Sequence, residues 1–118
     1  MRVHELAIMI GTNQPEPMAA FYGEMLGLER IERFDGIVFD MAGINVRILP
    51  HGEISGSSHD PARHQLNLFV DDVRAEFVRL RALAVPFVRE PEVESWGGTV
   101  ATMQDPDGNY VQILQEPS

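Results

Sequence analysis

The feature of this sequence that most constrains its fold is an internal repeat with a period of roughly 55–60 residues. In each half, the spacing of apolar residues predicts a strand, then a helix, then three short strands. The first copy begins near residue 3 and the second near residue 64. Duplicated supersecondary units of this kind bury a core together. The sequence therefore predicts an α+β fold built from two tandem βαβββ modules.

The predicted elements of the first module run in a fixed order. Residues 3–10 alternate as a strand does, prolines follow that suit a first helical turn, and Gly27 is placed to end the helix. Three strands are then expected at 28–34, 37–41 and 44–49, with turns at Asp35-Gly36 and Ala42-Gly43.

The second module repeats that order after a loop. Residues 51–63, rich in Gly, Ser and Pro, predict a mobile connection between module 1 at about 1–50 and module 2 at about 64–118. The second module is expected to contain a strand at 64–70, a helix capped by Asp71 or Asp72, and strands at 85–90, 98–104 and 110–115.

A helix covers only one side of each sheet. We therefore expect residues 1–118 to form a single domain whose curved mixed sheet surrounds a small-molecule cup, with the helices on the outer face.

Composition narrows the classes of function. The net charge is −9 and all nine basic residues are Arg, with no basic stripe, which argues against a nucleic-acid partner. No apolar run is long enough to span a membrane, and the N-terminus does not resemble a signal peptide, so a cytoplasmic protein is expected. The absence of cysteine excludes disulfides, thiolate metal sites and a thiol nucleophile.

Several short motifs resemble those of one family. They are Phe21-Tyr22 followed by Leu26-Gly27-Leu28, then Val70-Asp71-Asp72-Val73, Trp96-Gly97-Gly98 and Asp105-Pro106-Asp107-Gly108-Asn109. Their order and intervals resemble the vicinal oxygen chelate superfamily, which includes glyoxalase I, extradiol dioxygenases, fosfomycin-resistance enzymes and bleomycin-resistance proteins. This resemblance implies the same fold as the repeat does, and it also implies a homodimer.

The resemblance implies a single divalent metal in catalytic members, held by side chains of the first, fourth, fifth and eighth strands. Counting from the motifs, these positions fall on Ala7, Arg47, Gln65 and Gln112. A methyl group has no lone pair and a guanidinium repels a dication, so we expect no metal cofactor. If the strand register differs by one residue, His64 turns inward and is an alternative ligand for Zn, Fe, Mn or Ni. His4, three residues before Ala7, is a second off-register candidate.

Strand alternation predicts which side chains line the cup. The expected ligand-binding residues are Ala7, Arg47, Leu49, Gln65, Asn67, Phe69, Trp96, Tyr110 and Gln112, with Glu5, Met9, Asn45 and Leu114 beside them. Arg47 is expected to pair with Glu5 or with an anionic group of the ligand. In the alternative interpretation the polar side chains only bond one another, and the aromatic ones form core or dimer interface.

Two functions of different classes follow. One is a metal-free protein that binds or sequesters a drug-sized or metabolite-sized ligand, similar to the bleomycin-resistance proteins. The other is an enzyme: a metal-dependent lyase or dioxygenase, or a metal-free isomerase-type catalyst using Tyr110, Glu5 or His51 as acid or base. His51 and Glu53 also lie in the loop that could close over the ligand.

Overall fold

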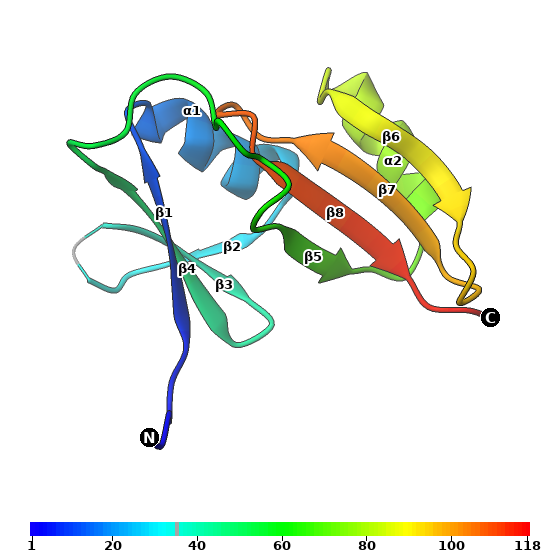
Figure 1. Cartoon of the computed structure of the whole chain (residues 1–118), viewed down its shortest axis with the longest axis horizontal. Coiled ribbons are helices and arrows are strands. Elements are labelled where there is room, and N and C mark those ends of the chain that lie inside the picture. Colours follow the sequence, from blue (N-terminus) through cyan, green and yellow to red (C-terminus); the bar gives the residue numbers. More distant parts are fainter. Residues whose placement is uncertain (35) are drawn as a thin grey trace. The chain divides into compact units, whose positions relative to one another are not determined.

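A computed structural model describes residues 1–34 and 36–118 of the chain (Figure 1). It divides into two compact units, unit 1 from Met1 to Gly56 and unit 2 from Ser57 to Ser118. Each unit contains a four-stranded mixed sheet and a helical segment in the order predicted for a βαβββ module. The α+β fold with tandem modules is confirmed. Within the described residues, no helix is long and apolar enough to cross a membrane.

Unit 1 begins with strand β1 (Ala7–Thr12), helix α1 (Pro15–Ala20) and a π-helical turn η1 (Phe21–Met25). Three strands follow: β2 (Glu29–Ile31), β3 (Ile37–Met41) and β4 (Ile44–Pro50). The strand order is β1-β4-β3-β2, with β1 parallel to β4 and the other neighbours antiparallel. The helical segment ends where Gly27 adopts a φ of +77°, a conformation that glycine tolerates. The predicted role of Gly27 is thus confirmed.

Unit 2 contains strand β5 (Leu66–Phe69), helix α2 (Val73–Ala82), and strands β6 (Phe87–Val93), β7 (Thr99–Gln104) and β8 (Tyr110–Gln115). Its strand order, β5-β8-β7-β6, repeats that of unit 1, and β5 again lies parallel to the last strand. The predicted helix cap is Asp72, whose Oδ1 accepts a hydrogen bond of 3.0 Å from the backbone N–H of Ala75.

Several strand limits differ from those expected. Strand β2 ends at Ile31 rather than at 34, and β6 covers Phe87–Val93 rather than 85–90. Strands β1 and β5 also start later than expected. Residues 3–6 do not join β1, because β1 pairs only with β4, and that pairing starts where Ala7 meets Asn45 at the beginning of β4. In unit 2, β5 starts at Leu66 opposite Val111, while the backbone N–H of Tyr110 donates to Pro61 instead. A strand extends only as far as its neighbour offers hydrogen bonds.

Two of the predicted turns are built differently. At Ala42 and Gly43 both φ angles are positive, 53° and 88°, as a two-residue hairpin requires. The turn before β8 depends on Asp105, a buried carboxylate that accepts hydrogen bonds from the backbone N–H groups of Asp107 and Asn109. The other predicted turn includes residue 35, which lies outside the described residues.

Candidate functional site

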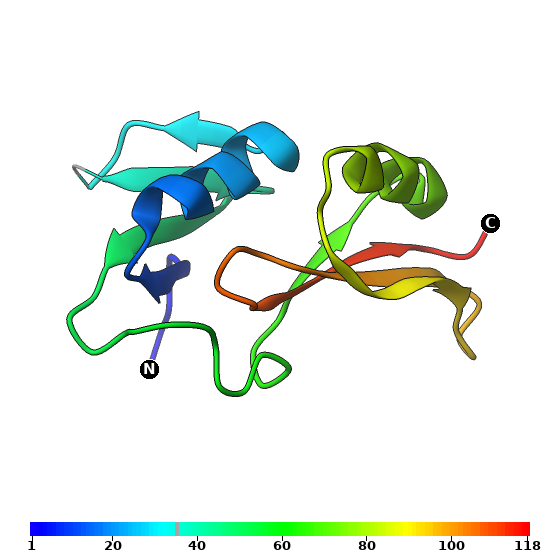
Figure 2. The same ribbon diagram turned by 90° about the horizontal axis from the view of Figure 1, so that it is seen from above.

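In each unit, the helical segment covers one face of the sheet and leaves the other face uncovered (Figure 2). In unit 1 the covered face is marked by Phe39, whose ring centre lies 6.5 Å from that of Tyr22. Val46 is the register partner of Phe39, and Ile8 is the partner of Val46, so both share that face. The alternate residues form what we call the open face of unit 1: Ala7, Met9, Glu29, Ile31, Val38, Asp40, Asn45, Arg47 and Leu49.

Arg47 is the cation of the open face of unit 1. It lies between Met9 and Val38 in the strand register. Its guanidinium carbon is 4.6 Å from the ring centre of Phe34, and that of Arg33 is 4.4 Å from the same ring. Both distances are within the range of cation–π attraction.

The predicted pairing of Arg47 with Glu5 is wrong. Glu5 forms its ion pair with Arg33, at 2.8 Å between Oε2 and Nη1. The physical reason is that Glu5 precedes β1 and so lies outside the register that places Arg47 beside Met9. Nothing in the sequence singled out Arg33 or Phe34, because an expected strand over 28–34 conceals the φ of +58° at Phe34.

In unit 2 the covered face is marked by the contact of Phe87 with Phe77 of α2, at 4.8 Å between ring centres. Met103 and Val111 are register partners on that side. The alternate residues of β5, β8 and β7 form the open face of unit 2: Asn67, Phe69, Tyr110, Gln112, Leu114, Val100, Thr102 and Gln104.

Polar groups form one row across this open face. Gln112 lies between Asn67 and Thr102 in the register, and its Nε2 donates to the Thr102 hydroxyl at 3.3 Å. Phe69, two residues beyond Asn67, is 62% exposed. An amide offers both donors and an acceptor, and an exposed ring offers apolar area. The amides of exposed Asn67 and half-buried Gln112 can therefore orient a polar organic molecule while the Phe69 ring packs against it.

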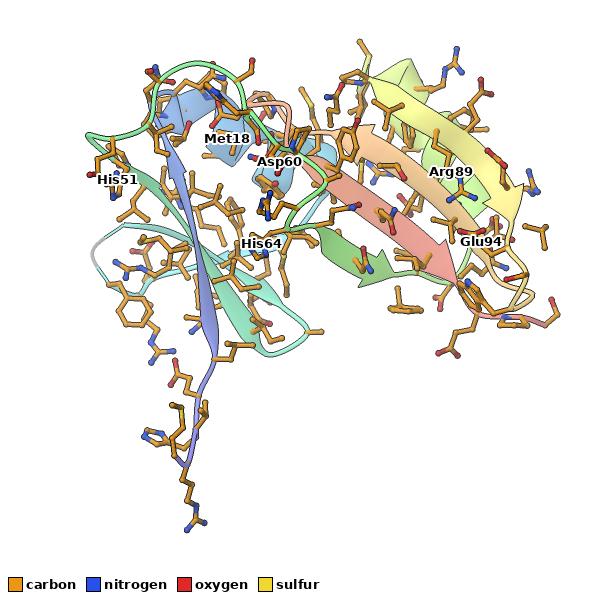
Figure 3. All side chains as sticks on the ribbon, viewed as in Figure 1. Met18, His51, Asp60, His64, Arg89 and Glu94 are labelled. Atoms are coloured by element: carbon orange, nitrogen blue, oxygen red, sulfur yellow. The ribbon has the colours of Figure 1, made fainter. Side chains whose placement is uncertain are left out.

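The other predicted site residues lie off the strands. His4, His64 and Gln65 are exposed and precede β1 or β5, and the Gln65 amide donates to the Ala62 carbonyl at 3.1 Å. Figure 3 shows His51 at the end of β4 and His64 ahead of β5. The Nδ1 atom of His51 accepts a hydrogen bond from the backbone N–H of Glu53 at 3.1 Å.

Trp96 lies in the connection from β6 to β7 and is 46% exposed. Its ring occupies the space where a side chain at position 98 would begin. The glycine at 98 is thus required by the ring that packs over it.

The perturbed charges of unit 2 form one ion pair near that connection. Arg89 Nη1 lies 2.9 Å from Glu94 Oε1, and Figure 3 shows the two side chains close together. The hydrogen bond from Arg89 lowers the pKa of Glu94, and the hydrogen bond to Glu94 raises the pKa of Arg89.

The sequence model of the Glyoxalase/Bleomycin resistance protein/Dioxygenase superfamily matches residues 4–113. The chain belongs to this superfamily. A bleomycin resistance protein from Klebsiella pneumoniae is 31% identical over 111 residues, spanning 82% of this chain and 80% of that protein.

Solved structures of superfamily members have the same fold. A glyoxalase/bleomycin resistance protein/dioxygenase from Nocardioides superimposes with a TM-score of 0.75 at 17% identity, covering 100% of this chain and 86% of that one. Lactoylglutathione lyase from Agrobacterium tumefaciens gives 0.74 at 18% identity, covering 97% and 94%. Likeness at this identity concerns the fold, since one fold carries many chemistries.

The residues at the positions that the motif resemblance assigns to a metal do not fit a divalent cation. Ala7 and Arg47 lie on the open face of unit 1 and contribute no electron pair, while Gln112 and Gln65 contribute only neutral amides. Across residues 1–34 and 36–118, no three His, Asp or Glu side chains gather closely enough to hold a metal ion. In a chain without cysteine, the usual side-chain ligands of a divalent ion are several carboxylates or imidazoles.

The predicted acid–base residues have different surroundings. Glu5 is engaged by Arg33, and the Nδ1 atom of His51 by the backbone of Glu53. Tyr110 begins β8 on the open face of unit 2 and is half-buried. Of the three, only Tyr110 is therefore placed beside the amide row.

Proposed function

We propose that this superfamily member binds a drug-sized or metabolite-sized organic molecule without a metal cofactor. The observation that carries the proposal is the open face of unit 2, where the Gln112 amide stands in a row of polar groups beside the exposed ring of Phe69. Apolar surface with a few oriented polar groups is the usual composition of a small-molecule site. The similarity to a bleomycin resistance protein supports binding as the function.

The free energy of such binding would come mainly from the aromatic surface. Burying a large apolar side chain is worth about 1.5–3 kcal/mol, and a neutral hydrogen bond adds roughly 1 kcal/mol net. Phe69 supplies area, while Asn67 and Gln112 select the orientation of the ligand. A cup in which a single ligand contacts both units stays a prediction of the sequence.

A thermal-shift titration with bleomycin, in buffer containing EDTA, tests this proposal. A ligand present at about 100 times its Kd stabilises the folded protein by about 2.7 kcal/mol. We expect stabilisation of the wild type and a reduced shift for Gln112→Met, which keeps the side-chain volume but removes the amide. Gln65→Met is the matched control, because Gln65 lies ahead of β5 and bonds Ala62.

Two results would contradict the proposal. One is no shift with bleomycin or with any member of a metabolite screen that contains cationic, anionic and neutral compounds. The other is a shift that appears only when a divalent metal replaces EDTA, which would favour the metal-dependent enzyme.

We further propose that the protein is a homodimer. Several large apolar side chains are exposed at strands and their ends, among them Leu6 at 58% and Val93 at 65%. Two-fold pairing commonly covers such surface and protects sheet edges. Sedimentation equilibrium should give about twice the chain mass of 13.2 kDa. A mass equal to that of one chain would refute the dimer.

A further inference from the structure

We infer that the ligand of this protein carries a carboxylate, and that Arg47 on the open face of unit 1 binds it. This inference rests on the proposed function and adds a chemical class of ligand to it. The group that binds the ligand in this inference is a permanently charged guanidinium, whereas the proposed function depends on the neutral amides of unit 2.

The backbone and one ring position the Arg47 side chain. Residue 47 lies inside β4, with β1 and β3 paired on either side, so its Cα cannot move independently of the sheet. The guanidinium then lies against the Phe34 ring, 4.6 Å from its centre. A cation held in this way loses less conformational entropy when it binds an anion, which favours binding.

Two cations share the Phe34 ring. Two guanidinium groups lie within 5 Å of the ring centre, and like charges so close to one ring repel each other. Arg33 is compensated by Glu5 at 2.8 Å. Among the ion pairs formed between described residues, none includes Arg47. An anion at Arg47 would relieve the repulsion.

The backbone conformation of Phe34 also supports a binding site at Arg47. Its φ of +58° lies in the left-handed region, which is unfavourable for a bulky non-glycine residue. Strained non-glycine residues are enriched at functional sites. Here its effect is to present a ring that is 44% exposed between two cations.

A planar carboxylate on an apolar group fits these neighbours best. A guanidinium binds a carboxylate through two parallel N–H···O bonds. Met9, the register partner of Arg47, is 55% exposed and offers an apolar contact next to that pair. Arg47 also stands at one of the positions where the superfamily resemblance would place a metal ligand. A fixed positive charge of the protein would thus attract the anionic group.

Titration by NMR with benzoate and benzamide tests this inference, because the two probes have nearly the same shape and differ in charge. The reporter is the Met9 methyl signal in methyl-labelled protein, assigned with Met9→Leu. A charge-assisted pair typically contributes enough for about a tenfold difference in Kd or more. We expect wild type to bind benzoate at least about tenfold more tightly than benzamide, and Arg47→Met to lose this preference.

Arg30→Met is the matched control. It removes one positive charge from the same sheet, but Arg30 is the register partner of Phe39 and so lies on the other face. Its preference for benzoate should stay that of wild type. Arg47→Lys keeps the charge without the two-pronged geometry and should give an intermediate preference, and it serves if Arg47→Met does not fold.

The outcomes separate the inference from the proposed function. Equal affinities for benzoate and benzamide in wild type, or an unchanged preference in Arg47→Met, would overturn the carboxylate inference while binding of bleomycin to the same sample still supports the proposed function. If benzoate and benzamide fail to bind wild type, and neither bleomycin nor any compound of the metabolite screen stabilises it, both proposals are overturned.

Discussion

The ion pair of Arg89 and Glu94 shows how one residue couples this fold to pH. The hydrogen bond from Arg89 lowers the pKa of Glu94 below its ordinary value of 4.5. A carboxyl group with a lowered pKa in the folded state stabilises that state above its unfolded pKa, and this contribution is lost as the pH falls through the folded pKa.

Glu94→Gln should therefore make the protein less sensitive to acid. We expect the variant to be less stable than wild type at about pH 6 and to approach wild type at about pH 3, because protonation of Glu94 removes from wild type the charge that the variant lacks. Urea denaturation midpoints at the two pH values measure the difference. Glu90→Gln removes a carboxyl whose contact with Arg81 is longer, 3.7 Å, and should show a smaller change. A stability difference independent of pH would contradict the assignment.

Gly98 is the position where a single methyl group should matter most. A Cβ there would overlap the ring of Trp96 and approach the Gln115 carbonyl oxygen to 2.7 Å. We expect Gly98→Ala to lower the free energy of unfolding by about 1–3 kcal/mol, as overpacking does. Trp96 is the one tryptophan in the chain, so its fluorescence should shift to longer wavelength as the ring is displaced.

Gly52→Ala is the control for this substitution, since nothing lies within 4 Å of a Cβ at that position. Equal stabilities of the two variants would show that the packing of Trp96 against Gly98 is not tight.

At single residues, the sequence predicted the strand faces better than the contacts. Alternation placed Arg47, Asn67 and Gln112 on the faces opposite the helices, and the observed register does the same. It did not reveal the partners of Arg47, because these depend on how the connection after β2 folds back. Gln65 was assigned to a strand that begins only at Leu66, because β8 offers no partner before Val111.

At the scale of the element, helix α2 begins at a side-chain cap. The Asp72 carboxylate accepts a hydrogen bond from the backbone N–H of Ala75, which otherwise has no partner inside the helix. We expect Asp72→Ala to lower the free energy of unfolding by about 1 kcal/mol. Thermal unfolding followed by circular dichroism measures this loss. Asp71→Ala, which removes an exposed neighbouring carboxylate, should be nearly neutral, and an equal loss in both variants would argue against the cap.

Most elements were predictable because their signals are local. Apolar alternation indicates a strand, prolines indicate the start of α1, and Gly27 indicates its end. The π-helical turn η1 was not predicted, because the shift from the α to the π hydrogen-bond pattern at Phe21 has no local sequence signal. Strand limits were less predictable for a similar reason, since they depend on a distant partner strand.

At the scale of the whole molecule, the fold and the chemistry separate. Residues 4–113 match the superfamily, and the repeated strand order explains why structures with less than a fifth identity superimpose. The fold does not determine which residues stand at the positions that the resemblance assigns to a metal, because the sheets form whichever side chains lie on their open faces. An Arg at position 47 and a methyl at position 7 are compatible with the sheet and incompatible with a dication.

Metal removal is the decisive measurement at this scale. We expect purified protein to contain far less than one equivalent of Zn, Fe, Mn or Ni, and its melting temperature to stay the same after treatment with EDTA. The reason is that a chelator destabilises a protein only by removing an ion that binds the folded state preferentially. Elemental analysis and thermal unfolding before and after treatment provide the two readouts. The net charge of −9 attracts loosely held cations, so both are measured after dialysis at high salt, which screens such binding. A full equivalent that survives dialysis, and whose removal lowers the melting temperature, would show that the ligands lie elsewhere in the fold and would favour catalysis over sequestration.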